Sequence, residues 1–299
     1  MGAHRIGTGD RSDERRAWVF AVLTGVCLAL LAASMSFFFE RAERRQHEMQ
    51  VRQLAMAVAH DLGGRLDRSL SAAVALGAVL RQGGGRVDNF PFLARELITE
   101  FGGISALQLA PGGTIAQVEP LAGNERVIGF SPVSDPVQGP EARRAIELRK
   151  LMLTGPFDLR QGGIGVVGRN PVFIRGADGQ EKFWGLVQVL IRVPDLLVMT
   201  RLDAIERAGL RYELWRMRPN DGERQVFARS SEQGLERPVD ITIPVPNGEW
   251  VLSVAPDAGW YSRLSLLIEG AIVVFVSLLG AIAAYLAWYR LAARIPEGN

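Results

Sequence analysis

The segment Leu153–Phe173, LTGPFDLRQGGIGVVGRNPVF, consists of two apolar arms joined by a glycine-rich turn. The first arm is apolar through Leu159, and Gly162 and Gly163 then supply residues that adopt positive φ without a steric cost. A valine-rich second arm follows, in which Pro171 favours a sheet edge or a bulge. The segment therefore predicts a β-hairpin, and the remainder of the chain is interpreted around it.

The same segment carries Gly163, Gly165 and Gly168 in the spacing GxGxxG that is typical of dinucleotide-binding loops. Such a loop needs a strand before it and a helix after it. Here Pro171 and β-branched residues follow, which disfavours a helix. A glycine-rich hairpin is the better interpretation.

The composition limits the possible functions of the 299-residue chain. Its 34 basic and 32 acidic residues nearly balance, so we expect no nucleic-acid partner. The lone cysteine is Cys27, and no histidine follows His60, which leaves the rest of the chain without histidine or cysteine chemistry. We therefore expect no metal, no cofactor and no enzymatic activity.

Carboxylates remain available for chemistry, but no spacing in the sequence pairs two of them. A solvated surface position is the expectation for each of Glu119, Glu125, Asp135, Glu141 and Asp158. A hydrolase that uses carboxylates scattered through the sequence stays open as an alternative, and it would need two of them to converge in one cleft.

Two apolar segments, residues 17–39 and 264–289, are long enough to cross a bilayer as helices. The first is longer than the core of a cleaved signal peptide, which favours an uncleaved anchor. Arginines in the short ends, residues 1–16 and 290–299, place both termini in the cytoplasm. We expect a two-pass protein of the bacterial inner (cytoplasmic) membrane, in contact with lipid, with residues 40–263 in the periplasm.

Residues 40–82 predict a stalk helix that continues out of the membrane and ends at Gly83–Gly85. Apolar side chains recur along it every four residues, at Leu54, Val58, Leu62, Leu66, Leu70 and Val74. Such a stripe suits packing on the protein's own domain or a dimer stalk, and both can hold along different parts of one helix.

The remaining periplasmic residues predict an α+β fold with two antiparallel sheets. Residues 83–193 form the first, with helices at 89–101 and 140–150 and strands at 104–109, 114–119, 183–191 and in the hairpin. Residues 194–263 form a smaller second sheet, with a helix at 194–208 and strands at 212–217, 225–228, 241–245 and 250–255.

Polar and aromatic side chains on the predicted core strands suggest a ligand pocket. They are Gln108, Thr154, Arg169, Asn170, Phe157, Phe173 and Trp184. For any one of them, ordinary packing of the aromatic rings and solvent exposure of the polar groups is the alternative.

A series of short motifs extends over roughly Phe101–Met217. They are Gly103-Ile104, Ala106-Leu107-Gln108, Pro111–Ile115, Pro120 with Gly123-Asn124, Arg143–Ile146, Leu153–Phe157, Gln161–Gly163, Pro171–Phe173, Phe183–Gly185 and Gly209-Leu210. Together they resemble the CHASE domain family. The resemblance implies an extracytoplasmic sensory module with two PAS-like sheets on a long N-terminal helix, flanked by transmembrane helices. It also implies a homodimer that controls a histidine kinase or a diguanylate cyclase.

Plant members of that family bind cytokinins, with an acidic residue before the short helix in contact with the ligand. That position falls near Ser131 here, and the nearest carboxylate is Asp135, which argues against cytokinin itself. The candidate ligand-binding residues are Gln108, Ser131, Asp135, Leu153, Thr154, Phe157, Val167, Arg169, Phe173 and Trp184.

The expected function is a sensory receptor that binds a small molecule of unknown identity and transmits a signal across the membrane. A periplasmic protein-interaction or scaffold module is the alternative. The resemblance implies an output domain after the second span, where only residues 290–299 follow. We therefore expect either the input half of a longer protein or a sensor that signals to a separate partner.

Overall fold

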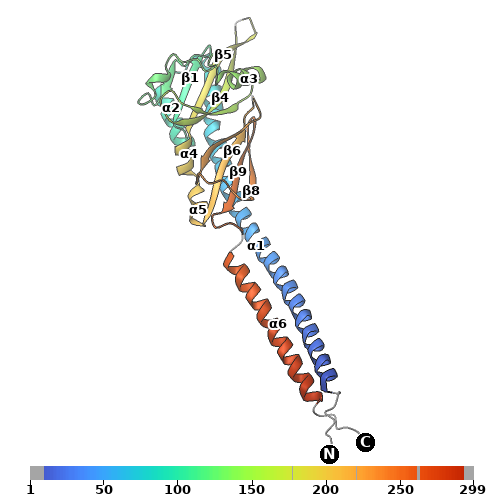
Figure 1. Ribbon diagram of the computed structural model, residues 1–299. Helices are drawn as coiled ribbons and strands as arrows, with labels where there is room; N and C mark the ends of the chain where they lie inside the picture. Colours follow the sequence, from blue (N-terminus) through green and yellow to red (C-terminus); the bar gives the residue numbers. More distant parts are fainter. Residues whose placement is uncertain (1–9, 177, 220, 261–262, 293–299) are drawn as a thin grey trace, which may run out of the picture. The chain divides into compact units, whose positions relative to one another are not determined.

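The computed structural model describes residues 10–176, 178–219, 221–260 and 263–292 (Figure 1). The chain divides into two compact units. One comprises the described residues up to Met49 together with those from Ala258 onward, and the other is Gln50–Asp257. The first unit is helical, and the second holds both β-sheets.

The first unit contains parts of two long helices. Helix α1 (Asp10–Gln82) begins there and continues into the second unit, and helix α6 (Arg263–Ala292) lies within it. Both are long and apolar enough to cross a bilayer. Small residues bring the helices close together, since a Cβ on Gly25 would lie 3.1 Å from the Cβ of Ala281.

Aromatic rings also pair between these helices. The rings of Trp18 and Tyr285 have centroids 5.6 Å apart. Such rings are typical of membrane–water interfaces. The expected cytoplasmic ends, residues 1–16 and 290–299, lie mostly outside the described residues.

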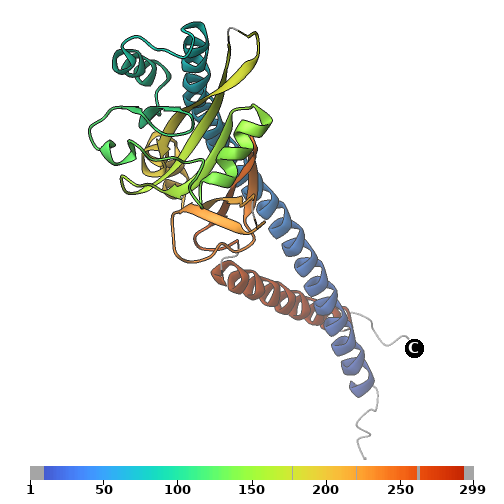
Figure 2. The ribbon, with the colours of Figure 1, turned by 90° about the horizontal axis from the view of Figure 1, so that it is seen from above.

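In the second unit, α1 packs against both sheets (Figure 2). The middle of the expected apolar row is buried, up to Leu70, but Val74 is 46% exposed. A step of four residues exceeds the 3.6 residues of a helical turn, so a row with that spacing drifts around the helix. The buried row continues instead through Ala73, Leu76 and Leu80. Helix α1 ends directly before the three glycines expected to stop it.

The first sheet has five antiparallel strands in the order β2-β1-β5-β4-β3. The strands are β1 (Ala106–Pro111), β2 (Gln117–Glu119), β3 (Met152–Asp158), β4 (Ile164–Arg175) and β5 (Glu181–Arg192). Two α-helices and a short 3-10 helix accompany them, namely α2 (Phe90–Phe101), α3 (Gly139–Leu148) and η1 (Glu125–Val127).

The predicted hairpin is confirmed as β3 and β4, which pair in antiparallel register. Its turn contains Gly162 and Gly163 with φ of 90° and 77°. Pro171 lies beyond the last residue of β4 that pairs with β3, and the register against β5 shifts between Val172 and Phe173. The proline therefore occupies a local edge next to a bulge, where its missing N–H costs no ladder hydrogen bond.

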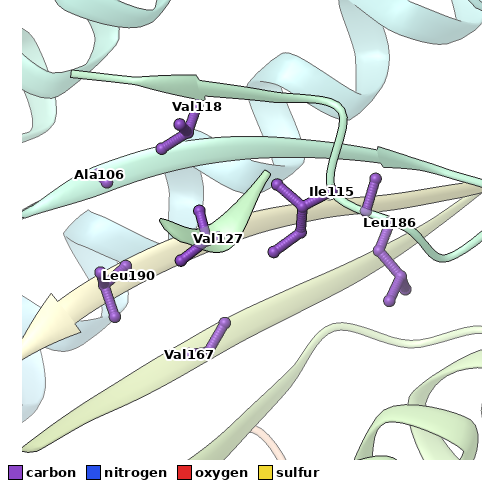
Figure 3. Close-up of a cluster of buried hydrophobic side chains, with 8 residues drawn as sticks. Ala106, Ile115, Val118, Val127, Val167, Leu186 and Leu190 are labelled. Carbon is purple, nitrogen blue, oxygen red and sulfur yellow. The ribbon is translucent and has the colours of Figure 1, made fainter. Parts of the chain in front are cut away.

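The two faces of the five-stranded sheet have different neighbours. One face packs on α1, where the Nδ2 of Asn170 donates to the carbonyl of Ala73 at 2.9 Å. The other carries an apolar cluster of Ala106, Ala110, Ile115, Val118, Val127, Val167, Leu186 and Leu190 (Figure 3). Because side chains alternate across a strand, the residues that share this second face are every other one along each strand.

The second sheet has four antiparallel strands in the order β7-β6-β9-β8. They are β6 (Leu210–Met217), β7 (Arg224–Arg229), β8 (Val239–Val245) and β9 (Gly248–Pro256). Its core includes the fully buried Trp250, whose ring lies 4.8 Å from that of Phe227. This sheet also contacts α1, since a Cβ on Gly63 would lie 3.4 Å from Cγ2 of Ile243.

The segment between the sheets departs from expectation. A single helix was expected over residues 194–208, but two helices are present, α4 (Val193–Met199) and α5 (Leu202–Arg207). Between them the β-branched Thr200 adopts an extended backbone, with φ −94° and ψ 156°. Its backbone geometry ends the first helix.

Candidate functional site

Three polar residues form a row across the five-stranded sheet. Gln108 on β1 is directly opposite Gln188 on β5, and Gln188 is directly opposite Arg169 on β4. Their exposed fractions are 4%, 1% and 1%. Since opposed residues of an antiparallel pair lie on one face, all three lie on the face away from α1.

Arg169 has neutral hydrogen-bond partners. Its Nε donates to Oε1 of Gln188 at 3.0 Å, Nη1 donates to Oγ1 of Thr154, and Nη2 donates to Oε1 of Gln138. Thr154 in turn donates to the carbonyl of Val167 at 2.9 Å. These contacts fix the guanidinium in one orientation within the core.

The charge of Arg169 is costly to bury. Burial lowers the pKa of Arg169 to about 10, while the carboxylates of Glu141 and Asp135 oppose that shift. The side chain therefore remains a cation at neutral pH.

A small cavity adjoins this row. Its polar wall is formed by Gln108, Gln188 and Arg169, and its apolar wall by Ile115, Val127, Phe130, Leu159, Val167 and Leu190. The free volume is about 20 Å³, which is room for about one water molecule. At its edge the guanidinium of Arg160 lies 4.2 Å from the centre of the Phe130 ring.

Gln188 presents an unsatisfied donor at this cavity. Its Oε1 accepts from Arg169, and this contact fixes which end of the amide is oxygen. Its Nε2 is buried and has no hydrogen-bond partner among the described residues. A buried amide N–H without a partner costs about 1–3 kcal/mol, which an acceptor in the cavity would offset.

Only part of the expected ligand-binding set lies at the cavity. Gln108, Val167 and Arg169 line it. Ser131 and Asp135 lie in the segment before α3. The Ser131 hydroxyl donates to a carbonyl of the β1–β2 turn, and Asp135 accepts two backbone N–H groups just before α3.

The other expected residues lie elsewhere on the same strands. Thr154 supports Arg169 from β3, and Leu153 is buried beside it. Phe157 lines a separate cleft. Phe173 lies near the far end of β4, with the guanidinium of Arg149 3.9 Å from its ring centre. Trp184 on β5 lies outside the cavity lining.

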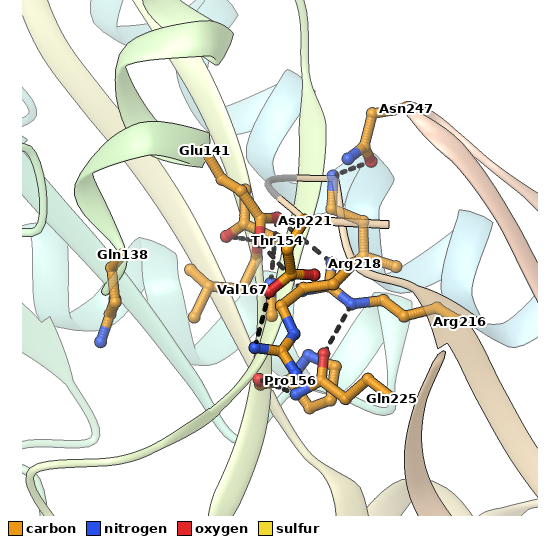
Figure 4. A network of polar contacts seen from close by, with 12 residues as sticks. Gln138, Glu141, Thr154, Pro156, Val167, Arg216, Arg218, Asp221, Gln225 and Asn247 are labelled. Atoms are coloured by element: carbon orange, nitrogen blue, oxygen red, sulfur yellow. Dashed lines mark hydrogen bonds and ion pairs between the residues drawn. The ribbon is translucent and has the colours of Figure 1, made fainter. Parts of the chain in front are cut away.

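The separate cleft lies between the two sheets and has a volume of about 360 Å³. Its wall includes a buried ion pair, in which both Nη atoms of Arg216 on β6 donate to the carboxylate of Glu141 on α3 at 2.9 and 3.2 Å (Figure 4). The Nε of Arg216 donates to Gln225, which donates to the carbonyl of Pro156. This network joins the second sheet to the first.

The expectation that Glu141 is a solvated surface residue is wrong. Its side chain is 4% exposed, and that of Arg216 is 6% exposed. The sequence spacing gives no sign of this pair, because the two residues are 75 positions apart. They meet only because α3 and β6 pack together.

Two residues of the site, Gln188 and Gln138, were not singled out from the sequence. Gln188 is the one polar residue in the otherwise apolar run Leu186–Ile191. That contrast was an available signal for a buried functional amide. Gln138 offers no such signal, since its position at the start of α3 is fixed by tertiary packing.

The family model of the CHASE domain matches residues 92–227. No curated protein matches the chain in sequence. Several solved structures share the fold, all at low sequence identity.

An extracellular ligand binding receptor from Desulfohalobium retbaense has a TM-score of 0.55 and 19% identity, over 69% of this chain and 40% of that one. The extracellular domain of the putative histidine kinase rpHK1S-Z16 has a TM-score of 0.51 and 15% identity, over 75% of this chain and 97% of that one. The sensory domain of the Campylobacter jejuni chemoreceptor Tlp3 has a TM-score of 0.50 and 11% identity, over 73% of this chain and 97% of that one.

At these low identities, the structural likeness shows a shared fold alone. The chain spans less than half the length of the Desulfohalobium receptor. The family match covers both strands of the predicted hairpin, the polar row and α3. Residues 92–227 of this chain therefore match the family model of the CHASE domain.

Proposed function

We propose that the chain is the extracytoplasmic input module of a signalling receptor in the bacterial inner membrane. A small molecule binds at the cavity of the five-stranded sheet, and the bound state is transmitted to a cytoplasmic histidine kinase or diguanylate cyclase, fused or separate. The CHASE domain supports a sensory role. We interpret both sheets as PAS-like.

One observation carries the choice of site. A buried cation and a buried amide N–H without a protein partner both lie at the same cavity, on Arg169 and Gln188. Buried polar groups in folded proteins are normally paired, so such a place suits a ligand that completes the pairing. Among the solved structures of similar fold, one is described as a ligand-binding receptor.

Contacts lead from the cavity to the second sheet. Arg169 donates to Thr154, and the N–H of the next residue, Gly155, donates to Oε2 of Glu141 at 3.3 Å. Glu141 pairs with Arg216 on β6. A change at the cavity that moves α3 therefore acts directly on the second sheet, from which the chain continues to α6. This is a spatial route, and its role in signalling is part of the proposal.

The membrane topology is also proposed. Both apolar helices cross the bilayer, and the unit Gln50–Asp257 lies in the periplasm. In a Cys27→Ser background, a cysteine at the 86% exposed Val198 should react with a membrane-impermeant maleimide in intact cells. Reaction only after permeabilisation would contradict this topology.

Ligand binding is tested with the full chain in detergent micelles. We expect at least one member of a metabolite panel of neutral, cationic and anionic compounds to raise the melting temperature and to give saturable heat in isothermal titration. The same compound should bind at least about tenfold more weakly to Gln188→Leu, which removes the unpartnered amide. Gln180→Leu, in the turn before β5, is the matched control.

Two outcomes contradict the proposed function. Absence of binding by every compound, with wild-type protein that is folded by circular dichroism, would favour the protein-interaction alternative. Binding that is the same in wild type and Gln188→Leu would place the ligand elsewhere.

A further inference from the structure

We propose that the ligand of the five-stranded sheet is a small organic monocarboxylate, whose carboxylate group pairs with Arg169 and accepts from the Gln188 amide. The remainder of the ligand is apolar and carries no cationic group. This inference rests on the proposed function and specifies the chemistry of the same site.

Arg169 has no contacting counter-ion among the described residues. Its three hydrogen-bond partners, Gln188, Thr154 and Gln138, are all uncharged. A buried charge is stabilised when an opposite charge pairs with it, and it is costly otherwise. A guanidinium has five N–H groups, so two remain for a ligand oxygen after these three bonds.

The nearest carboxylates are committed to other partners. Glu141 accepts from both Nη atoms of Arg216 and from the N–H of Gly155. Asp135 accepts the N–H groups of Val137 and Gln138 just before α3. These charges lessen the fall in the pKa of Arg169 from a distance, but neither takes the place of a contacting anion.

The neutral donor at the cavity, the side-chain amide of Gln188, also suits a carboxylate. The Nε2 of Gln188 is a donor group for which the described part of the chain offers no acceptor. A carboxylate only accepts, and its two oxygens offer about four lone-pair directions. One carboxylate oxygen on Arg169 would supply the missing counter-charge, and the other on Gln188 would accept from the orphan Nε2 donor.

The other lining residues limit the rest of the ligand. None of the described residues that line the cavity is acidic, so an ammonium group would have no anionic partner there. The walls outside the polar row are mostly apolar, from Ile115 to Leu190. Arg169 is the buried cation of the lining and matches one negative charge, whereas the Arg160 guanidinium is exposed at the edge over Phe130, so the second charge of a phosphate dianion would have no buried partner.

Entry of the ligand requires the cover of the cavity to move, because the free volume holds only about one water molecule. Gln138 belongs to this cover, and it lies directly before α3. Since the Gln138 side chain borders the cavity, a ligand carboxylate that binds beside Nη2 of Arg169 needs the space of Gln138 and displaces its Oε1. The start of α3 is then released from the sheet, three residues from Glu141.

The test uses matched pairs of compounds on the full chain in detergent micelles. Propionate, butyrate and benzoate are compared with propionamide, butyramide and benzamide by isothermal titration and by melting temperature. We expect saturable binding of at least one acid and at least about thirtyfold weaker binding of its amide, as for loss of one buried charge pair.

The variant Arg169→Met should weaken binding of that acid by a similar factor. Arg169→Lys should restore part of the binding, since it keeps the charge but loses the planar donor pair. Arg175→Met, at the exposed end of the same strand, is the matched control. If Arg169→Met fails to fold by circular dichroism, the acid–amide comparison on wild type still decides the matter.

The outcomes separate this inference from the proposed function. One outcome is that the wider metabolite panel yields a neutral or cationic ligand that binds at Gln188 while no acid binds. This result would contradict the inference that the ligand is a carboxylate, and it would leave the proposed receptor function intact. Acid binding that is unchanged in a folded Arg169→Met also overturns the inference. Absence of binding by every compound of either panel contradicts both.

Discussion

At the scale of single residues, the ion pair between Glu141 and Arg216 differs from the other salt bridges described. It joins the two sheets, and both side chains are almost completely buried. Pairs such as Arg207–Asp203 lie in solvent, with both side chains more than half exposed. Water screens an exposed pair, whereas a buried partner left alone keeps its charge without compensation.

We expect Glu141→Ala to lower the free energy of unfolding by about 3–5 kcal/mol, because it leaves Arg216 buried and unpaired. Asp203→Ala, in an exposed pair, should cost about 0–1 kcal/mol. Urea unfolding of the full chain in micelles, followed by near-UV circular dichroism, measures both. The double variant Glu141→Leu with Arg216→Met should lose less than Glu141→Ala. Equal losses in the buried and exposed single variants would show that the buried pair has no special role.

Arg169 gives a second residue-scale prediction, on pH. Burial lowers its pKa to about 10 in the folded protein, well below the ordinary value of an arginine. Between these two values the unfolded state binds more protons, so stability rises with pH there. Below about pH 10 the side chain is charged in both states, and its cost of burial is constant.

Carboxylate affinity should therefore stay constant from about pH 6 to 9, where both Arg169 and the ligand are ionised. It should fall above about pH 10 as Arg169 loses its proton. Isothermal titration in buffers of matched ionic strength measures the profile. A midpoint at about pH 6.5 would indicate a histidine, which the described cavity lining does not contain. It would exclude Arg169 as the residue that sets the pH dependence of binding.

At the scale of elements, α1 and β4 approach each other closely at a glycine. A Cβ on Gly168 would lie 2.1 Å from Cδ2 of Leu70, which is far inside van der Waals contact. The helix side chain therefore occupies the space that any other residue at this position of the strand would need. The contact sets the register of the helix against the sheet.

We expect Gly168→Ala to destabilise the protein by about 1–3 kcal/mol through overpacking. Leu70→Ala should cost about 2–5 kcal/mol through the cavity it leaves. In the Leu70→Ala background, the additional cost of Gly168→Ala should largely disappear, because the clashing methyl group is gone. Urea unfolding of the four proteins measures this coupling. Additive losses would show that the two residues do not compete for one space.

The sequence was sufficient to predict elements whose signals are local. The β3–β4 hairpin followed from its glycines and valines, and the end of α1 followed from Gly83–Gly85. The apolar row on α1 was right in its middle but wrong at Val74, because a four-residue spacing does not match the helical turn. Local patterns therefore place elements better than they place the buried side of a long helix.

The site depends on the register in which β1, β5 and β4 pair, and the local sequence patterns do not reveal that register. Arg169 and Gln108 were both suspected, but only the pairing of three strands shows that Gln188 lies between them. A shift of one residue in any strand would turn its member of the row toward α1. The ion pair of Glu141 with Arg216 was missed for the same reason, since it depends on how a helix and a distant strand pack.

At the scale of the whole molecule, we propose that the homodimer implied by the CHASE resemblance forms through α1, which requires a free surface along this helix. Met56 and Val74 are 45% and 46% exposed, although both are apolar. They are 18 residues apart, which is five helical turns, so both lie on one side of the helix. The opposite side is occupied by the sheets, which leaves this side for a second copy of the chain.

In a Cys27→Ser background, we expect Val74→Cys to form a disulfide-linked dimer in membranes under mild oxidation. In a two-fold dimer through α1, each position on the contact side faces its counterpart near the axis, as a disulfide requires. Val198→Cys, exposed on α4, is the control and should remain monomeric on non-reducing gels. Cross-linking of Val198→Cys but not of Val74→Cys would place the contact on another surface. If ligand then changes the yield at Val74, the helix pair has two arrangements of different affinity, which is what transmission across the membrane requires.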